Sequence, residues 1–414
     1  MKKILIFTFL SFICIYPKVI AQDLNQVQIN YIKGLAKNVH VDDSYKNGRW
    51  DPLLEVIGDK DIVLLGELNH GAKEIFLTRN DLIKQLHQQL NFDVILFESG
   101  FGEVGTVDLQ KDALNHKQMT YGLFGPWRTQ EFEDLMLYVK SNKMSIGGVD
   151  VQKTGSNFKK LLYKLSVSKS IDTSLYYNIE QRFNRQKKLL TNRKAKFDDL
   201  KDSTQRLIGD YQTLLNAFRK GTPQENGKAN LLVERTIENR LKYLHYFLDF
   251  TKTKDWSKRW KDRDEMMALN VKWLIEHFYQ GKKVIVVAHN FHIAKFNEKE
   301  EVMGEFLSKA YGSRMYVLGA FAGSGSYADN SGKEKPMKSI DSTGVDMRTI
   351  IESLEGKTHF MDISKEKPSP SNTFLFEKII VNDSFIDLYG SNQLVVSKHF
   401  DGILLIDKIS LPEK

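Results

Sequence analysis

The chain has 414 residues, of which 41% are hydrophobic and 27% charged, and its formal net charge is +8. This is the composition of a globular protein with a large core, and so modest a charge over this length gives no reason to expect a nucleic-acid partner. The single cysteine, Cys14, lies in the leader described next. A mature chain would therefore have no disulfide, thiol nucleophile or cysteine-ligated metal.

Residues 1–21 have the features of a secretory signal peptide. Lys2 and Lys3 precede an apolar run, and Ala21 supplies a small residue before Gln22. The run is too short to span a bilayer, and no later apolar run reaches the roughly 20 residues that a membrane-spanning helix needs. We therefore expect an exported chain, periplasmic or extracellular, that begins at Gln22 and has no stable membrane insertion.

Short apolar strands alternate with amphipathic helices after residue 22. Apolar runs predict buried strands at residues 62–66, 93–98, 145–150, 283–288 and 315–321. Helices are predicted at residues 22–48, 72–90, 256–279 and 301–311, and after a capping Thr129. In the tail we expect a helix at residues 347–354 and strands near residues 373–380 and 393–396. Together these elements predict one α/β domain over residues 22–414, with a mostly parallel central sheet flanked by helices.

Residues 156–255 interrupt this alternation with long, charged, helix-favouring sequence. A clear break occurs only at Gly221, Thr222 and Pro223, a helix-stop signal. We interpret the segment as an inserted helical hairpin or small bundle that packs over the sheet. It serves either as a lid over a site or as a scaffold.

Two predicted strands end in loops that carry histidine. Glu67 and His70 follow the first strand, where an imidazole can act as general base and a carboxylate can orient it. His289 and His292 follow the strand at residues 283–288, and they suit a general-base pair, a transition-state clamp or two metal ligands. A structural role remains possible for each pair, with Glu67 capping the next helix. Because both loops stand at strand ends, we expect them to share one site.

Charged side chains also end strands or lie on apolar helix stripes. Glu98 and Asp150 end two predicted strands, where an acid can simply cap the helix that follows. For Asp150 this role is as good as a functional one, whereas Glu98 follows a buried apolar run and needs a partner. The charged or polar residues on or beside the apolar stripes are Arg79, Arg263, Asp264 and Asn270. Such groups must be paired or face a wet cavity, so they form internal salt bridges, contact a substrate, or do both.

The chain resembles the erythromycin esterase family in a series of motifs. These are G-E-x-x-H-G at residues 66–71 with Glu74 and Arg79 after it, F-E-S at 97–99, P-W-R-T-Q-E at 126–131, G-G-V-D at 147–150, R-D-E-M-M-A-L-N at 263–270 and A-H-N-F-H at 288–292. Any one motif is a weak signal, but the set is specific and covers roughly residues 60–320 in the family's order.

The resemblance implies an α/β core with a helical subdomain and the hydrolysis of an ester, in the best-known members the macrolide lactone. By position, His70 resembles the family's general base, which activates water without forming an acyl-enzyme, and Glu67 would orient it. Arg79, His289 and His292 resemble the other site residues. The lack of a G-x-S-x-G nucleophile elbow agrees with this. The residues expected to bind substrate or support the site are Glu74, Glu98, Trp127, Arg128, Asp150, Arg263, Asp264 and Asn270.

The sequence thus predicts an exported hydrolase of a small-molecule carboxylic ester or macrolide-type lactone. His70 would take a proton from water while Glu67 steadies the imidazolium, and His289, His292 or Arg79 would stabilise the developing oxyanion. Two alternatives stay open. In one, a metal-dependent peptidase or amidase holds a divalent metal ion with the same Glu/His set. In the other, the protein binds a haem-like ligand without turnover.

Overall fold

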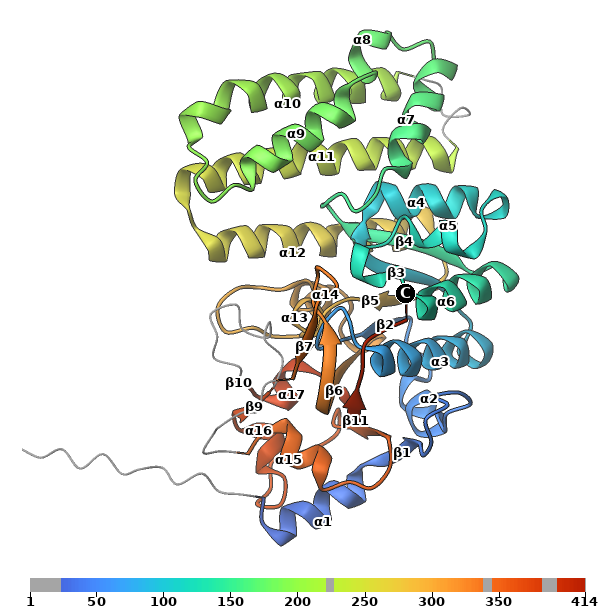
Figure 1. Cartoon of the computed structure of the whole chain (residues 1–414), viewed down its shortest axis with the longest axis vertical. Helices are drawn as coiled ribbons and strands as arrows, with labels where there is room; N and C mark the ends of the chain where they lie inside the picture. Colours follow the sequence, from blue (N-terminus) through green and yellow to red (C-terminus); the bar gives the residue numbers. More distant parts are fainter. Residues whose placement is uncertain (1–23, 221–226, 338–344, 382–392, 414) are drawn as a thin grey trace, which may run out of the picture.

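The computed structural model describes residues 24–220, 227–337, 345–381 and 393–413. The predicted signal peptide and the predicted helix break at Gly221, Thr222 and Pro223 lie outside the described residues. In Figure 1 a layer of long helices lies at the top, above a domain built around a twisted sheet. Among the described residues, no helix combines the length and the apolar character needed to cross a bilayer.

The central sheet is mostly parallel. Within the described residues its strands follow the order β1-β8-β11-β6-β2-β5-β3-β4, and β7 pairs with β6. All pairs from β11 to β4 are parallel, whereas β8 pairs antiparallel with both β11 and β1. The strands are β1 (Lys37–His40), β2 (Ile62–Leu65), β3 (Phe92–Gly100), β4 (Ser145–Asp150), β5 (Lys283–Val287), β6 (Met315–Ala328), β7 (Glu334–Pro336), β8 (Thr358–Asp362) and β11 (Gly402–Ile409). The predicted fold class is confirmed.

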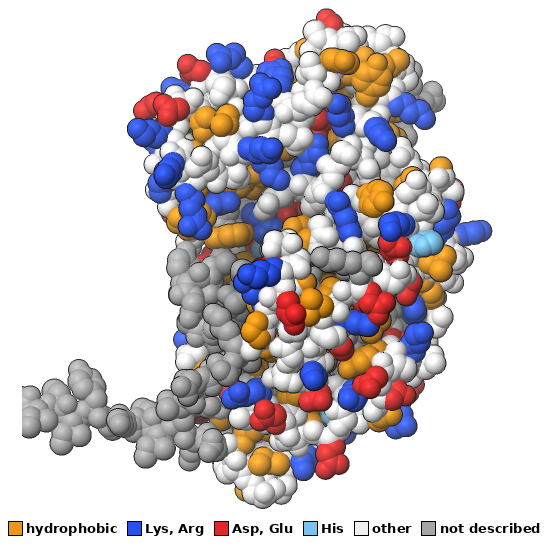
Figure 2. Space-filling model, viewed as in Figure 1, with side chains coloured by type: hydrophobic (Ala, Val, Ile, Leu, Met, Phe, Trp, Pro, Cys, Tyr) orange, Lys and Arg blue, Asp and Glu red, His pale blue; other side chains and the backbone are white. Residues whose placement is uncertain are grey.

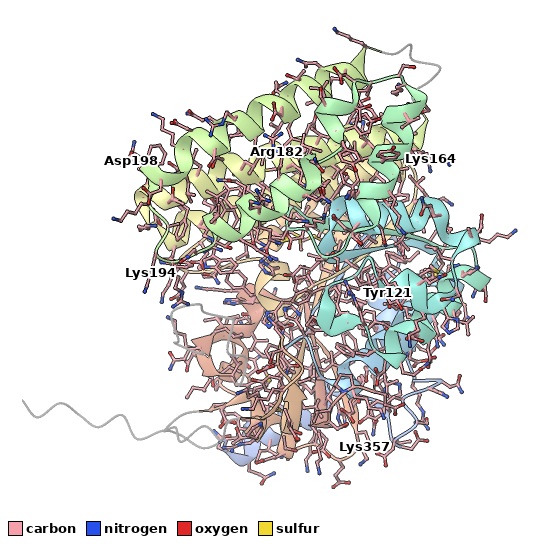
Figure 3. The ribbon with its side chains drawn as sticks, turned by 45° about the horizontal axis from the view of Figure 1, so that its top comes forward. Tyr121, Lys164, Arg182, Lys194, Asp198 and Lys357 are labelled. Atoms are coloured by element: carbon pink, nitrogen blue, oxygen red, sulfur yellow. The ribbon has the colours of Figure 1, made fainter. Side chains whose placement is uncertain are left out.

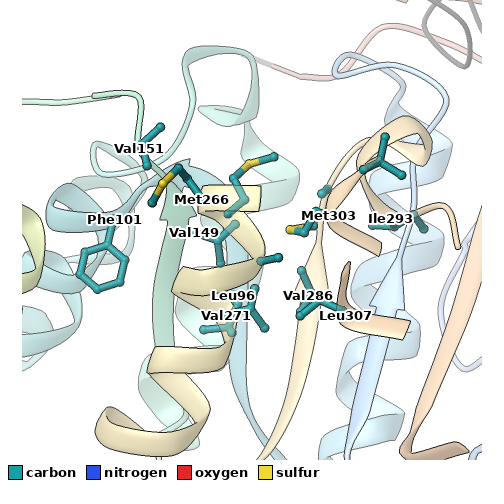
Figure 4. Packing of buried hydrophobic residues seen from close by; sticks show 14 of the residues in the cluster. Leu96, Phe101, Val149, Val151, Met266, Val271, Val286, Ile293, Met303 and Leu307 are labelled. Carbon is teal, nitrogen blue, oxygen red and sulfur yellow. The ribbon is translucent and has the colours of Figure 1, made fainter. Parts of the chain in front are cut away.

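The sheet has a hydrophobic core on each face, which explains why a central strand such as β2 is a continuous apolar run. In β2, Leu64 belongs to one core and Val63 to the other. Figure 4 shows the first core, in which Leu96 and Val286 of neighbouring strands lie close to side chains from the covering helices, such as Val271 and Met303.

Helices cover both faces. On one side lie α3 (Lys73–Leu90) and α6 (Gln130–Ser141), and on the other α12 (Trp256–Trp273) and α14 (Met303–Tyr311). The remaining elements outside the insertion include α1 (Gln26–Leu35), α2 (Asp51–Ile57), α4 (Phe101–Gln110), α5 (His116–Thr120), α13 (Asn290–Ile293), α15 (Met347–Glu352), α16 (Thr373–Phe376), β9 (Ile379–Ile380), β10 (Gln393–Leu394) and α17 (Val396–His399).

The predicted insertion is a helical layer. It contains α7 (Asn157–Ser168), α8 (Thr173–Tyr176), α9 (Ile179–Leu190), α10 (Phe197–Arg219) and α11 (Lys228–Thr253). Lys and Arg side chains are frequent on its outer surface, as Figure 2 shows for one face. Figure 3 turns this layer toward the viewer, with Lys164 and Arg182 on its helices.

A buried ion cluster joins the insertion to the sheet domain. Arg240 of α11 donates to Glu103 of α4 at 2.7 Å and to Glu180 of α9 at 3.3 Å. Glu180 also accepts hydrogen bonds from Tyr211 and Lys153. Burial alone would raise the pKa of Glu180, but Arg240 and Lys153 outweigh it and lower the pKa to about 2.

Several element predictions were wrong in detail. Residues 22–48 contain a shorter helix, α1, followed by the edge strand β1. Residues 373–380 form a helical turn before the two-residue β9, and residues 393–396 form only the two-residue β10 before α17 begins. Thr129 is the N-cap residue of α6, but its side chain makes no capping hydrogen bond. The strands β8 and β11 were not predicted.

The Arg240→Met substitution tests the ion cluster. It leaves Glu103 and Glu180 buried without their shared cation, so we expect the free energy of unfolding to fall by about 3–5 kcal/mol. Urea-induced unfolding followed by circular dichroism measures the change. The matched control is Arg182→Met, because the ion pair of Arg182 with Asp210 is exposed and should contribute less than about 1 kcal/mol. Equal stability of Arg240→Met and the control would contradict the assignment.

Candidate active site

The two histidine loops and the two strand-end acids meet at the carboxyl edge of the sheet. This follows from the strand order, because β2, β5, β3 and β4 are neighbours and run parallel. They surround a cavity of about 420 Å³. Its lining residues are His70, Glu98, Phe124, Gly125, Asp150, Gln152, Lys153, Thr154, Lys187, Trp260, Arg263, His289, Phe291, His292 and Asn330.

Glu67 is fully buried, and three side chains donate to it. His70 Nδ1 lies 2.6 Å from Oε1, and Trp127 Nε1 donates to the same oxygen at 3.0 Å. Arg79 Nη1 donates to Oε2 at 2.7 Å. The carboxylate is thus compensated by one cation and two further donors, as a buried charge requires.

His70 lies between Glu67 and the cavity, with 13% of its side chain exposed. A carboxylate can only accept, so Nδ1 carries a proton and the neutral ring has its lone pair at Nε2. The rings of Phe124, Trp127 and His289 pack edge-on around the imidazole, with centroids 5.2–5.8 Å away. This packing and the Glu67 bond fix the ring orientation.

His289 is buried, and both ring nitrogens bond to the backbone. Nε2 lies 2.9 Å from the carbonyl oxygen of Leu68 and therefore carries the proton. Nδ1 accepts from the backbone N–H of Phe291, so the ring is neutral. Burial, aided by nearby His70, lowers the pKa of His289 to about 3. His289 therefore links the β5 loop to the β2 loop as a neutral group.

The His292 ring is positively charged, unlike that of His289, because it lies between two carboxylates. Nδ1 is 2.8 Å from Asp264 and Nε2 is 3.1 Å from Glu98. Burial disfavours a charged ring, but Asp264 and Glu98 outweigh that effect and raise the pKa of His292 to about 9. At neutral pH the ring is an imidazolium that donates to both acids.

Arg263 of α12 connects the two strand-end acids. It donates through Nε and Nη2 to Asp150, the shorter bond being 2.7 Å, and through Nη2 to Glu98 at 2.9 Å. Its Nη1 lies 3.1 Å from Nε2 of His292. While that nitrogen carries a proton directed at Glu98 it cannot accept from Nη1, and the Arg263 side chain lines the cavity beside it.

The structure brings most predicted site residues together, either in the cavity wall or directly behind it. Arg79 and Trp127 are buried behind Glu67, and Asp264 is buried behind His292. Their contacts are internal, so the salt-bridge interpretation applies to Arg79. Arg79 does not line the cavity, and both ring nitrogens of His289 have backbone partners. Of the three groups predicted to stabilise an oxyanion, only His292 therefore brings positive charge to the wall.

Three predicted supporting residues lie elsewhere. Glu74 accepts from the backbone and hydroxyl of Ser410 and so attaches α3 to the C-terminal segment. Arg128 donates to backbone carbonyls at residues 121, 123 and 154. Asn270 bonds to the carbonyl of Val149 and to Arg235. They fix the surrounding elements and do not line the cavity.

Several lining residues had no signal in the sequence. Phe124 and Gly125 stand just before a motif that we identified, so proximity could have indicated them. Trp260 lies in the helix predicted at residues 256–279, where an apolar residue is expected to pack in the core. Lys187 comes from the charged insertion, and no local pattern distinguishes it from the many lysines beside it. In the part of the chain that the structure describes, no three His, Asp or Glu side chains are grouped to hold a metal ion.

An open, mostly parallel α/β sheet with acids, histidines and arginines at its carboxyl edge defines an α/β protein with a ligand site at that edge. The chain belongs to the erythromycin esterase family, whose model matches residues 87–409. Membership supports a hydrolase. The matched range includes His289 and His292 but begins after Glu67 and His70.

Curated relatives match nearly the whole chain. A Bacillus subtilis (strain 168) protein named "Putative hydrolase YbfO" is 26% identical over 390 residues, covering 86% of each chain. Erythromycin esterase type II of Escherichia coli is 25% identical over 423 residues, covering 90% of this chain and 95% of the relative.

Solved structures share the fold. A Bacillus cereus protein aligns with a TM-score of 0.72 and 19% identity, covering 93% of this chain and 98% of the other. A mutant of the erythromycin esterase EreC in its open conformation gives a TM-score of 0.64 and 16% identity, covering 91% of this chain and 98% of the other.

The contrast between the two histidines of the β5 loop is testable by NMR. We expect the His292 ring to stay protonated at about pH 7.5 and to titrate near 9, because Asp264 and Glu98 hold its charge. The folded-state pKa exceeds the ordinary 6.5, so this stabilisation is complete below pH 6.5 and is lost as pH rises through 9. It amounts to about 3 kcal/mol.

The free energy of unfolding should therefore fall less steeply in His292→Gln than in the unsubstituted protein as the pH rises from about 6.5 to 9. Urea-induced unfolding at a series of pH values measures this slope. His116→Gln is the control, since the His116 side chain is 43% exposed. A His292 resonance that titrates near its ordinary value would refute the assignment.

Proposed function

We propose that the protein is an exported hydrolase that cleaves a carboxylic ester or macrolide-type lactone by histidine-activated water, without a covalent acyl-enzyme. The observation that carries the proposal is the pairing of Glu67 with His70 Nδ1 at 2.6 Å, which directs the basic Nε2 of a cavity-lining ring away from the carboxylate. Family membership and the name of the Escherichia coli relative support ester chemistry. Export rests on the predicted leader alone.

In the mechanism, His70 Nε2 takes a proton from a water molecule in the cavity as that water attacks the ester carbonyl. The ring becomes an imidazolium, and the negative charge of Glu67 stabilises it. Arg79 and Trp127 hold Glu67 in place, so the carboxylate need not reorganise during the reaction. The protonated His70 can then deliver its proton to the leaving alkoxide.

The developing oxyanion needs a donor on the cavity wall. Arg263 Nη1 is the best placed, because Asp150 and Glu98 bind the other nitrogens of its guanidinium. The imidazolium of His292 beside it adds positive potential, although both of its N–H groups are directed at carboxylates.

Two features favour water over a protein nucleophile or a metal ion. The described cavity wall contains no serine or cysteine, and the hydroxyl of its one threonine, Thr154, donates to the carbonyl of Gly122. The ring nitrogens of His289 and His292 are all occupied by backbone or carboxylate partners. Metal ligation would have to break these bonds and deprotonate His292.

The His70→Ala substitution tests the base. We expect kcat/KM for an ester or lactone that the protein cleaves to fall by at least about 10²-fold, because no other lining group has a comparable free imidazole nitrogen. A panel of macrolide lactones, simple esters and amides, assayed with the mature protein, identifies the substrate. His116→Ala is the control, and full activity of His70→Ala would make the proposed base wrong.

A chelator distinguishes the proposed mechanism from that of a metal-dependent peptidase or amidase. We expect activity to be unchanged after dialysis against EDTA, because water is activated by an imidazole held by a carboxylate. Loss of activity with rescue by one added divalent ion would instead support a metal-dependent peptidase or amidase. A visible absorption band on adding haem, without turnover of any substrate in the panel, would support a binding protein.

A further inference from the structure

Lys187 is a cation on the cavity wall without a carboxylate partner. It comes from α9 of the insertion, and its ammonium donates to the backbone carbonyl of Lys153 at 3.2 Å. Among the described residues, no acid forms an ion pair with it. Burial lowers the pKa of Lys187, and Asp150, its strongest favourable neighbour, is already bound to Arg263.

The other cations of the wall are compensated. Lys153 pairs with Glu180 at 3.1 Å, and Arg263 pairs with Asp150 and Glu98. His292 lies between Asp264 and Glu98. A partly buried ammonium loses part of its hydration and normally recovers that cost from a counter-charge. Lys187 therefore brings to the cavity a positive charge that no ion pair with a described residue neutralises.

The structure also fixes the position of this charge. Glu180 lies two helical turns earlier on α9 and on the same side, where it belongs to the buried cluster with Arg240 and Glu103. The ion pairs of this cluster attach α9 to the sheet domain. Lys187 is therefore held at the cavity by a packed helix. Nearby, Phe124, Trp260 and Phe291 provide apolar wall for the uncharged part of a ligand.

We propose that Lys187 binds an anionic substituent of the substrate, a carboxylate or phosphate, so that the preferred esters carry a negative charge apart from the scissile bond. This inference rests on the proposed ester hydrolysis at His70. An ammonium suits such groups because it acts as a compact point charge with three donors. Lys187 is then a specificity residue, and Arg263 and His70 act on the ester itself.

The test compares two esters that differ mainly in charge, the mono-para-nitrophenyl ester of glutaric acid and para-nitrophenyl valerate. We expect the unsubstituted protein to prefer the anionic ester. In Lys187→Gln, the ratio of kcat/KM for the anionic to the neutral ester should fall about 10- to 100-fold, mainly through KM. Lys187→Arg should recover part of the ratio. Lys188→Gln, which removes an exposed charge from the next position of the same helix, should leave it unchanged.

An unaltered ratio in Lys187→Gln, or no preference in the unsubstituted protein, overturns the inference while ester hydrolysis stands. If neither these esters nor the lactone panel is cleaved, the proposed function fails. Calorimetric titration with glutarate then decides the anion site. Weaker binding to Lys187→Gln than to Lys188→Gln supports it, and equal or absent binding overturns it.

Discussion

The candidate site depends on the burial of one carboxylate, that of Glu67. An ionised acid at 0% exposure is tolerated only where cations and donors replace its lost hydration, and here Arg79, Trp127 and His70 do so. Each of these bonds places a different element: α3, the loop before α6 and the loop after β2. Removing any one donor would leave charge uncompensated, so Glu67 couples the folding of these segments to the orientation of His70.

The same edge of the sheet gives two histidines of one loop opposite charge states. The ring nitrogens of His289 hydrogen-bond to backbone groups and the ring is neutral, whereas His292 lies between Asp264 and Glu98 and is charged. Because their partners differ, His289 links the β5 loop to the β2 loop as a neutral group, and His292 of the same loop supplies a positive potential. Residue type and spacing, which gave three possible roles for the pair, do not contain this information. The difference in charge is set by Asp264 of α12 and Glu98 of β3, which lie far from the loop in the sequence.

The sequence allowed prediction of the parallel strands that bear the site, because β2, β3 and β5 contain apolar runs of four residues or more, and β4 is a short buried segment that ends on Asp150. From these runs alone the meeting of Glu67, His70, His289 and His292 could be expected. The strand β11 was missed although it pairs between β6 and β8 near the middle of the described sheet. Its apolar residues, Ile403 to Ile406, form a short run late in a glycine- and serine-rich tail. The local sequence pattern of β11 does not reveal that this strand pairs between β6 and β8 inside the sheet.

Lys187 could not be predicted for a related reason. The insertion is basic throughout, and only the packing of α9 onto the cluster around Arg240 selects which lysine faces the cavity. The sequence suggested that the insertion serves as a lid over the site or as a scaffold, but the structure indicates a third role, in which the insertion forms part of the cavity wall. Its buried ions hold it to the sheet domain, and that attachment makes α9 part of the cavity wall. The sheet edge supplies the groups suited to bond cleavage, and the insertion can change its surface charge and so alter which ligands fit without disturbing Glu67 or His70. If the proposed function is correct, variation in such an insertion would change substrate choice while the groups proposed for hydrolysis remain the same.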